Sequence, residues 1–314
     1  MEKDCRADAI FEDFRPGADV RWRAADHVNA TRLTEKDERR ATRRAEREAA
    51  HQRARERGET SLTRLPTEGL SIPQIALATI EKIRQLAPQL SGDYLDIGAG
   101  NGELIDAVTR TFPVKPRACD YRDDLMAIDG IRVDVADLNT QALPYPDASF
   151  DLVTCTEVIE HLEHYRSTLR EAARVLRPGG VFVVSTPNVL NLRSRLRYLF
   201  FGFFNMFGPL RLGDDRYHST HGHINPVSYF YLAHSLSVAG FHDISVSVDK
   251  LQRRSWIPLS LLWAPIRIVA EFSIRREKRE KLQTINDENE PFVRDMNRLD
   301  LLLGRTVVVG CRKR

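Results

Sequence analysis

The most informative segment of the chain is Asp-Ile-Gly-Ala-Gly-Asn-Gly-Glu, residues 96–103. It follows the apolar pair Tyr94-Leu95 and precedes Leu-Ile-Asp-Ala-Val, residues 104–108. This order predicts a strand, a tight glycine turn and a helix, which is how an open α/β sheet holds a nucleotide-like ligand at its carboxyl edge. Glycines allow the backbone to approach the ligand where a Cβ atom would collide with it.

The glycine turn departs from the dinucleotide-binding pattern in two ways. Its spacing is G-x-G-x-G rather than G-x-G-x-x-G, and Glu103 stands where the third dinucleotide glycine would fall. Asp96 adds a second acid at the end of the strand. Acids at this turn repel a pyrophosphate at short range and suit a ligand that carries an ammonium and a sulfonium. We therefore expect a positively charged ligand.

Three downstream features support this interpretation. Residues 115–120 read as a second strand ending in Asp120, 22 positions after Gly98, where a βαβ unit returns a carboxylate to a ribose diol. Residues 131–135 read as a third strand, followed by Ala136-Asp137-Leu138. Residues 143–162, LPYPDASFDLVTCTEVIEHL, supply a turn that feeds a buried fourth strand.

Together these motifs resemble the class I S-adenosylmethionine-dependent methyltransferases, whose first motif is an acid followed by G-x-G-x-G. The resemblance implies that Asp137 accepts a hydrogen bond from the adenine amino group, with Asp134 as the fallback. It implies S-adenosyl-L-methionine as the cofactor. The implied cofactor-binding residues are Asp96, Gly98, Gly100, Gly102, Asp120, Tyr121, Asp137, Leu138 and Thr156.

The expected fold is α/β, a Rossmann-like seven-stranded methyltransferase sheet with six parallel strands, one antiparallel last strand and helices on both faces. Further strands are expected at 180–186, 242–248 and 303–311, and helices at 71–90 and 226–239. The family normally joins its last two strands by a hairpin, whereas here residues 249–302 intervene. We expect a charged, largely helical extension over 1–70, a cofactor-binding core over 71–250 with an aromatic cap at 190–222, a helical apolar insertion over 251–302, and the last strand with a basic tail over 303–314.

Composition limits the remaining classes. Residues 31–58 are rich in Arg, Glu, Ala and Lys, which predicts a helix that is polar on all sides, either a solvated arm or an RNA-binding or self-associating one. The net charge of +3 does not argue for a polyanionic partner. The four cysteines lack C-x-x-C spacing, and Cys119 and Cys155 are expected in the core. The charged opening of the chain has no signal-peptide pattern, so we expect a cytoplasmic protein.

Two apolar stretches, 196–212 and 256–270, are rich in aromatic residues and bordered by arginines. Proline or arginine interrupts each run, so neither is expected to span a bilayer. One interpretation is a helical cap that buries these aromatics over the mouth of the site. The other is an interfacial surface that places the protein peripherally at the inner face of a membrane.

Candidate catalytic residues follow the fourth and fifth strands. They lie in Thr-Glu-Val-Ile-Glu-His, residues 156–161, in Ser-Thr-Pro-Asn, residues 185–188, and in the cluster His218, His221 and His223. Methyl transfer to a hydroxyl needs alignment of the reactants and removal of a proton. We expect His161 and His223 as candidate bases and Glu160 as the residue that orients one of them. Glu160 and His161 could instead only satisfy loop backbone.

The same residues allow a metal site. Glu157, Glu160 and His161 offer two carboxylates and an imidazole within one turn, and His223 would be the fourth ligand of Mg²⁺ or another divalent cation. Over about residues 94–241 the pattern resembles two metal-assisted O-methyltransferase groups, one acting in ubiquinone biosynthesis and one on the 2′-hydroxyl at small-RNA 3′ ends. A bound cation would lower the pKa of a substrate hydroxyl.

The expected function is S-adenosylmethionine-dependent O-methylation of a small-molecule, lipid-linked or glycan-linked hydroxyl by in-line methyl transfer. One alternative is a metal-assisted RNA 2′-O-methyltransferase, although the chain shows no dedicated RNA-binding module and we do not expect a nucleic acid partner. The other is a non-catalytic cofactor-binding interaction protein. Fold does not fix the acceptor, and the sequence does not disclose the oligomeric state.

Overall fold

The computed structural model describes residues 73–210, 222–279 and 284–314. The chain divides into two units, Met1–Leu65 and Pro66–Arg314, and all described residues belong to the second. The expected N-terminal extension over 1–70 therefore lies outside the described residues, as do His218 and His221.

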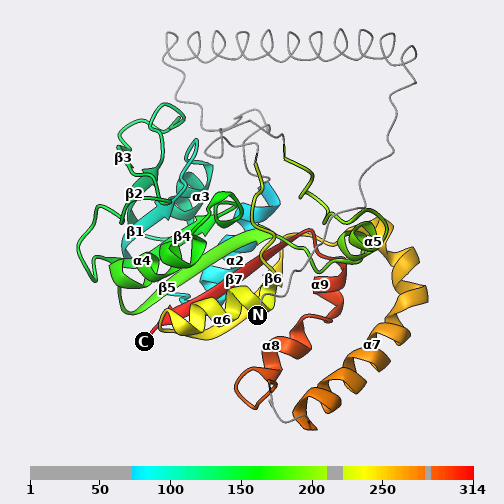
Figure 1. The fold of residues 1–314 in the computed structure, drawn as a ribbon. Helices are drawn as coiled ribbons and strands as arrows, with labels where there is room; N and C mark the ends of the chain where they lie inside the picture. The colour runs from blue at the N-terminus through cyan, green and yellow to red at the C-terminus, as the bar shows by residue number, and fades with distance from the viewer. Residues whose placement is uncertain (1–72, 211–221, 280–283) are drawn as a thin grey trace, which may run out of the picture. The chain divides into compact units, whose positions relative to one another are not determined.

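The core is a seven-stranded sheet in the order β3-β2-β1-β4-β5-β7-β6 (Figure 1). β7 runs antiparallel to both of its neighbours, whereas β1 to β5 pair in parallel. The expected arrangement of six parallel strands and one antiparallel last strand is confirmed. The strands are β1 (Gly92–Ile97), β2 (Val114–Asp120), β3 (Val133–Val135), β4 (Phe150–Thr156), β5 (Leu176–Pro187), β6 (Phe241–Val248) and β7 (Thr306–Lys313).

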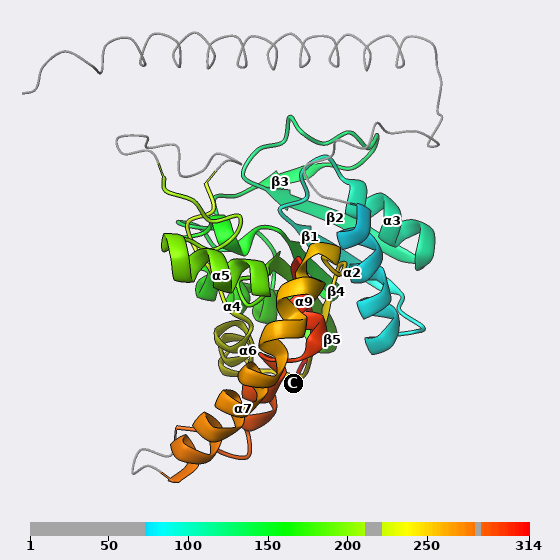
Figure 2. The same cartoon turned by 90° about the vertical axis from the view of Figure 1, so that its right-hand side faces the viewer.

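The strands of the sheet are buried on both sides because helices cover both of its faces. Alternate strand residues point to opposite faces, so that Tyr94 and Leu95 of β1 belong to different hydrophobic clusters. Helices α2 (Pro73–Leu86) and α3 (Glu103–Thr111) pack on the first face, and α4 (Tyr165–Val175) and α6 (Tyr229–Val238) on the second (Figures 1 and 2). The described cysteines Cys119, Cys155 and Cys311 are free and buried, as expected for core residues.

β5 is longer than the sequence predicts. A strand was expected at 180–186, but β5 already begins at Leu176. Leu176 pairs with Phe150, and the register then shifts before Leu152 pairs with Val181. The strand therefore accommodates Pro178 and the two glycines through a β-bulge rather than through a helix end.

The expected helical insertion between the last two strands is present. It contains η2 (Arg253–Ser255), α7 (Trp256–Arg279), α8 (Glu290–Asp295) and α9 (Leu299–Leu303). α7 continues through Pro265, so this proline does not end the helix. By length and composition alone, the helical stretch Arg253–Arg279 could cross a membrane, and 11% of its apolar window is buried.

The second apolar stretch forms α5 (Leu192–Phe201) and the loop that follows it. Phe207 is buried, but Tyr198, Phe200 and Phe201 are 52%, 82% and 60% exposed. The described residues therefore leave the aromatic side chains at the end of α5 largely exposed, which the interpretation of a cap that buries them does not predict.

Candidate active site

The glycine turn between β1 and α3 has the backbone conformation that its residues suggest. Gly98, Gly100 and Gly102 have φ values of 74°, 52° and 87°, in a region that side chains with a Cβ rarely adopt. A Cβ on Gly98 would lie 2.2 Å from Val158 Cγ2, and one on Gly102 would lie 2.7 Å from Ile128 Cδ1. Gly98 and Gly100 line a cavity, whereas Gly102 does not and instead permits close packing at the start of α3.

Asp120 ends β2 beside this turn and is nearly buried. Its Oδ2 accepts a hydrogen bond of 2.9 Å from the Gly100 amide, so the carboxylate and the turn fix each other. Burial raises its pKa from the usual range, which the hydrogen bonds from Gly100 and Arg122 oppose. A carboxylate held in this way can accept hydrogen bonds from a ribose diol.

Asp96 lies at the end of β1 and is 2% exposed. Thr154 donates a hydrogen bond of 2.6 Å to Asp96 Oδ1, and the Tyr94 hydroxyl donates one of 2.9 Å to Thr154. Burial raises the pKa of Asp96 to about 7. A ligand ammonium would favour the ionised form, so this carboxyl fits a cationic ligand.

Of the acids after β3, Asp137 lines the cavity and Asp134 does not. Asp137 accepts hydrogen bonds from the Asn139 amide at 3.0 Å and the Thr140 hydroxyl at 3.2 Å, which shape the loop. Asp134 pairs with Arg117 at 2.7 Å and accepts from the Tyr145 hydroxyl at 2.9 Å. Asp137 therefore remains the candidate adenine partner. The expected cofactor-binding residues Tyr121, Leu138 and Thr156 also line the cavity.

Glu157 follows β4 and is one of four described non-glycine residues with a positive φ, here 55°. Its amide donates to Ser185 Oγ at 3.1 Å, and Ser185 Oγ donates to Glu157 Oε1 at 3.0 Å. Burial raises the pKa of Glu157 to about 7, and nearby Arg305 opposes the shift. This strained residue is thus held by β5 at the wall of the cavity.

Residues 185–188 support the site rather than face an acceptor. Ser185 holds Glu157, and the Thr186 hydroxyl donates to Glu160 Oε2 at 3.1 Å. The Asn188 side chain donates to the carbonyls of Leu301 at 2.7 Å and Gly304 at 3.0 Å, which anchors the end of the insertion. The three polar side chains are almost completely buried, so each acts through the residue that it holds.

Glu160, His161 and His223 come together although they are far apart in sequence. One potential ligand atom from each lies within 4.8 Å of the others, and the two imidazole rings meet edge to face at 4.8 Å between centroids. The amides of Ile224 and Asn225 donate to the Glu160 carbonyl at 2.9 and 3.0 Å, which fastens the His223 segment to η1 (Ile159–His161). Glu157, the fourth expected metal ligand, is not in this group and bonds to Ser185 instead.

The donor set of this cluster fits a divalent cation. His161 Nδ1 donates to the Gly222 carbonyl at 2.9 Å, which places the lone pair on Nε2 and resembles the outer-shell bond of a metal-bound histidine. His223 Nδ1 and Glu160 Oε1 are buried and have no hydrogen-bond partner among the described residues. Burial, followed by the neighbouring His161, lowers the pKa of His223 to about 4, so its imidazole is neutral at pH 7. Two imidazoles and one carboxylate suit a borderline ion such as Fe²⁺ or Zn²⁺ better than Mg²⁺.

A single cavity of about 300 Å³ joins these groups. The glycine turn, Asp120 and Asp137 line one part of it, and His161 and His223 line another. Five acids line the cavity, against one arginine: Asp96, Glu103, Asp120, Asp137 and Glu157. Glu160 lies outside this lining and is completely buried. The arrangement places a cation-favouring pocket and two imidazoles within reach of one bound molecule.

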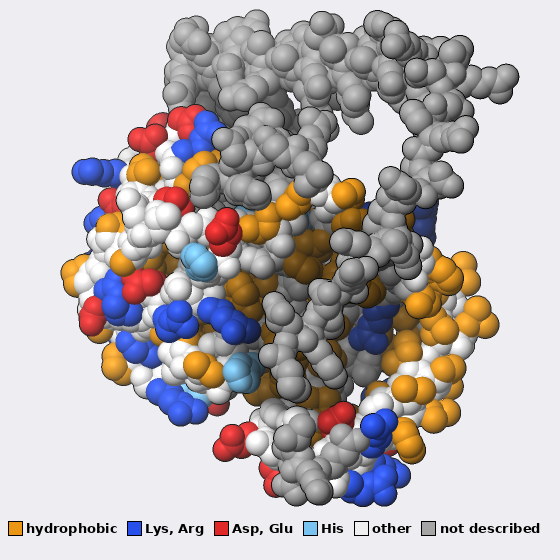
Figure 3. Space-filling view, in the orientation of Figure 1, with side chains coloured by type: hydrophobic (Ala, Val, Ile, Leu, Met, Phe, Trp, Pro, Cys, Tyr) orange, Lys and Arg blue, Asp and Glu red, His pale blue; other side chains and the backbone are white. Residues whose placement is uncertain are grey.

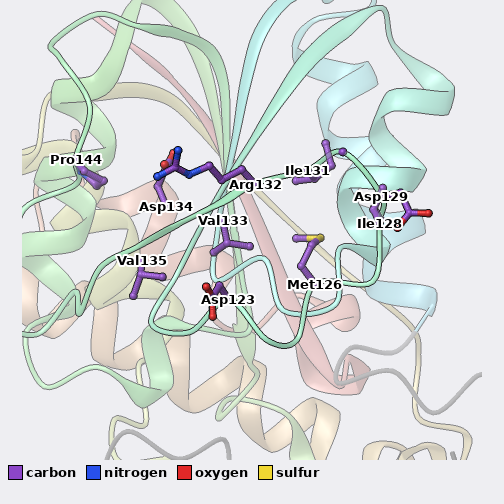
Figure 4. Close-up of a pocket in the computed structure, with 11 residues that line it drawn as sticks. Asp123, Met126, Ile128, Asp129, Ile131, Arg132, Val133, Asp134, Val135 and Pro144 are labelled. Carbon is purple, nitrogen blue, oxygen red and sulfur yellow. The ribbon is translucent and has the colours of Figure 1, made fainter. Parts of the chain in front are cut away.

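A second hollow lies at the β3 edge of the sheet and is larger and more open (Figure 4). It is lined by β3 and by the loops on either side of it, between Asp123 and Pro144, with Arg132 close to Asp134 (Figure 4). No residue of the glycine turn lines this hollow, and its Asp134 is already paired with Arg117. The first cavity is therefore the candidate cofactor site.

The sequence analysis missed several residues of the cavity. Arg305, at the end of the insertion, lines it and pairs with the buried Asp249 at 2.9 Å. Ile75 of α2 and Met206 after α5 also line it. No local motif marks these three residues, and Ile75 brings α2 to the cavity wall.

Comparison with known proteins agrees with this geometry. A family model described as a methyltransferase domain matches residues 73–246, more than half of the chain. A probable S-adenosylmethionine-dependent methyltransferase of Mycolicibacterium smegmatis is 42% identical over 112 residues, 33% of this chain and 42% of that protein. The 27-O-demethylrifamycin SV methyltransferase of Amycolatopsis mediterranei is 32% identical over 125 residues, 36% of this chain and 45% of that protein. The chain thus spans less than half the length of these curated relatives.

A solved S-adenosylmethionine-dependent methyltransferase from Archaeoglobus fulgidus is 18% identical, with a TM-score of 0.46 over 76% of this chain and 94% of that one. The extent of the family match is decisive, since it spans the glycine turn, the acids after β2 and β3, and His223. The chain therefore belongs to the methyltransferase-domain family and, as its motifs and sheet order indicate, to the class I S-adenosylmethionine-dependent methyltransferases.

Proposed function

We propose that the protein transfers a methyl group from S-adenosylmethionine to a hydroxyl of a small-molecule, lipid-linked or glycan-linked acceptor. One observation carries this proposal: a single cavity is lined by the carboxylate-rich glycine turn and by His161 and His223. When bound, the cofactor supplies an electrophilic methyl group. The chain's own residues then have to align the acceptor and accept its proton.

The cofactor side of the cavity has the features that this ligand needs. Asp96 and Glu103 give negative potential near the turn. The positions of Asp120 and Asp137 in the cavity lining support their assignment to the ribose and to the adenine amino group. Because the lining acids outnumber the single arginine, a cationic donor binds more favourably than a phosphorylated dinucleotide.

The acceptor side provides the base. His161 and His223 line the cavity, and a neutral imidazole can accept a hydroxyl proton at pH 7. Glu160 lies behind them, fixed by Thr186, and positions the pair rather than touching the acceptor. Similar proteins include enzymes named for methylation at oxygen and at nitrogen, such as the sarcosine/dimethylglycine N-methyltransferase of Halorhodospira halochloris, 33% identical over 35% of this chain. The imidazole pair is what favours oxygen, since a hydroxyl must lose its proton.

The test has two stages. Isothermal titration with S-adenosylmethionine should show binding, and absence of binding would remove every enzymatic proposal. A tritiated-methyl assay on fractionated lipid, small-molecule and RNA extracts should label the lipid or small-molecule fraction. His161→Ala should abolish labelling and retain cofactor binding. Labelling confined to RNA would support the RNA methyltransferase instead, and binding without any labelling would support a non-catalytic protein.

We further propose that Glu160, His161 and His223 hold a divalent cation, on the evidence of the two buried unpartnered atoms His223 Nδ1 and Glu160 Oε1. With a cation bound, the two imidazoles would be ligands rather than bases, and the cation would take over their role by lowering the pKa of the acceptor hydroxyl. After dialysis against Zn²⁺, metal analysis should show one ion per chain, and His223→Ala should lose it. Glu157→Gln is the matched control and should keep the ion, because Glu157 lies outside the cluster. No bound metal in the unchanged protein would refute this part and leave methyl transfer intact.

A further inference from the structure

One side of α7 is apolar and exposed to solvent. We call this side the outer face of α7 and define it as Ile257, Leu261, Pro265, Ile268 and Phe272. Spacings of three or four residues place these side chains in one line along the helix. Ile257, Leu261, Ile268 and Phe272 are 63–75% exposed, at positions where a surface helix of a soluble protein normally carries polar residues.

The opposite side of α7 is fixed to the rest of the molecule. Leu259 is buried in a cluster with Leu192 of α5 and with Leu302 and Leu303 of α9. Farther along, Glu271 pairs with Arg294 of α8 at 2.9 Å, and Lys278 pairs with Glu290. The helix is therefore held with its outer face pointing away from the core.

Arginines continue the outer face beyond both of its ends. Arg254 precedes Ile257 by three positions, and Arg275 and Arg279 follow Phe272 by three and seven. All three are exposed. Figure 3 shows hydrophobic side chains along α7 at the right, with Lys and Arg gathered at the lower end of the helix. Trp256 and Trp263, 53% and 46% exposed, flank this line with rings of the type that favours a lipid–water boundary.

The end of α5 adds a second apolar patch. Tyr198, Leu199, Phe200 and Phe201 are 52–82% exposed. α5 is tied to α7 through the contact of Leu192 with Leu259, and to the insertion through Arg195, which donates to the Met296 carbonyl at 2.8 Å. The two patches are thus carried by one packed unit. Exposed apolar surface of this extent marks an interaction site.

We propose that the outer face of α7 and the end of α5 bind the surface of an anionic lipid bilayer. Apolar side chains enter the boundary between headgroups and acyl chains, and the arginines contact anionic headgroups. This surface goes beyond the proposed function and does not depend on it. It adjoins the cavity, because α5 leads into Met206, which lines the acceptor side.

The charges favour this occupant over a second copy of the chain. The five residues of the outer face include no acid. Arg275 pairs with Glu271 at 2.9 Å beside this face, whereas Arg254 and Arg279 have no carboxylate partner among the described residues. A two-fold contact through this face would bring these two cations together without further acids to pair with them. An interfacial position is favoured over a spanning one, because spanning would carry Arg267 and the Glu271–Arg294 pair into hydrocarbon.

The test is co-sedimentation of the full chain with vesicles of phosphatidylcholine, alone or with one third phosphatidylglycerol. We expect binding to the mixed vesicles and at least about tenfold weaker binding to phosphatidylcholine alone, since each arginine near an anionic surface contributes roughly fivefold. Alkaline carbonate should release the bound protein. Retention after carbonate would show a spanning helix and overturn the interfacial assignment.

Two double variants locate the surface. Leu261→Glu with Ile268→Glu should weaken vesicle binding by more than about tenfold, because two charges would enter the apolar boundary. Leu77→Glu with Val238→Glu is the matched control: both side chains are similarly exposed, at 66% and 69%, but lie on α2 and α6. The control should bind vesicles like the unchanged protein. Both variants should keep their melting temperature and cofactor affinity.

The remaining outcomes oppose the proposal. Equal loss in both double variants would show that the outer face of α7 has no special role. Failure of the unchanged protein to bind either vesicle would overturn the proposal, and if Leu261→Glu with Ile268→Glu then converted a dimer to a monomer, the face would be assigned to a second copy. Vesicle binding needs neither cofactor nor acceptor, so failure here is separate from failure of methyl transfer.

Discussion

The two parts of the cavity are built differently. The cofactor part uses residues at the ends of β1, β2 and β4, each next to the motif that marks it, such as Asp120 holding the Gly100 amide. The acceptor part depends on contacts between distant segments, such as Glu160 with Ile224, or Asn188 with Leu301. The structure of the cofactor part is therefore determined by local sequence, whereas that of the acceptor part depends on how the insertion packs against the core.

We expect the largest effect from a substitution of Gly100 in the cofactor part of the cavity. This residue has a φ of 52°, which a β-branched side chain rarely adopts, and it lies at the cavity wall. Gly100→Val should reduce S-adenosylmethionine affinity by more than about 100-fold by calorimetry, corresponding to at least about 3 kcal/mol.

Gly130→Val is the matched control for Gly100→Val. Gly130 also has a positive φ, of 81°, but it has open space around it and does not line this cavity. This variant should be less stable and still bind the cofactor normally. Equal losses in the two variants would mean that backbone strain, and not the approach of the ligand, explains the result.

Asn188 tests the part that depends on long-range contacts. Asn188→Ala leaves the carbonyls of Leu301 and Gly304 without this buried donor and should lower the free energy of unfolding by about 2–4 kcal/mol, measured by urea denaturation. Asn286→Ala, in an exposed turn, should cost less than about 1 kcal/mol. A small effect at Asn188 would mean that the insertion does not depend on this anchor.

The same comparison explains what could be predicted from sequence. The glycine turn and Asp120 follow from spacing within short segments, whereas the sheet arrangement was expected from the resemblance to the methyltransferase family. The placement of Arg305 does not, because it depends on Asp249 at the far end of an insertion of more than 50 residues. Nor does sequence spacing reveal that Glu157 turns to Ser185 while Glu160 joins His223, since a positive φ at Glu157 redirects the chain.

The continuation of α7 through Pro265 was also beyond local rules. A proline inside a helix removes one backbone hydrogen bond and usually kinks or ends the helix. Here Leu259 before it and Ile274 after it are both buried, so tertiary contacts hold the two halves together. Helical stability in proteins comes mainly from such packing.

A substitution of Asp120 tests the assignment of this residue to the ribose of the cofactor. Asp120→Ala removes a charged acceptor from the ribose position and frees the Gly100 amide, and should cost about 1.5–3 kcal/mol of cofactor affinity. The matched control is Asp134→Ala, at the acid that pairs with Arg117 outside the cavity. An unchanged affinity in Asp120→Ala, or an equal loss in both variants, would contradict the ribose assignment.

The smallest expected effect is the pH dependence that Asp96 gives to cofactor binding. Its pKa of about 7 means that the buried carboxyl is about half protonated at neutral pH in the unliganded protein. Binding of a cation favours the ionised form, so affinity should rise with pH up to about 7, by at most tenfold per unit, and then level off. Calorimetry between pH 5.5 and 8 measures this slope.

Asp96→Asn should bind the cofactor more weakly and lose most of the slope, because it removes the titrating group and keeps an oxygen that can accept a hydrogen bond from Thr154. If the slope persists in Asp96→Asn, another acid of the cavity, such as Glu157 with its pKa of about 7, controls it. That result would mean that an acid after β4, and not Asp96 of β1, is the carboxyl whose ionisation controls cofactor binding. The controlling acid would then lie at the boundary between the two parts of the cavity.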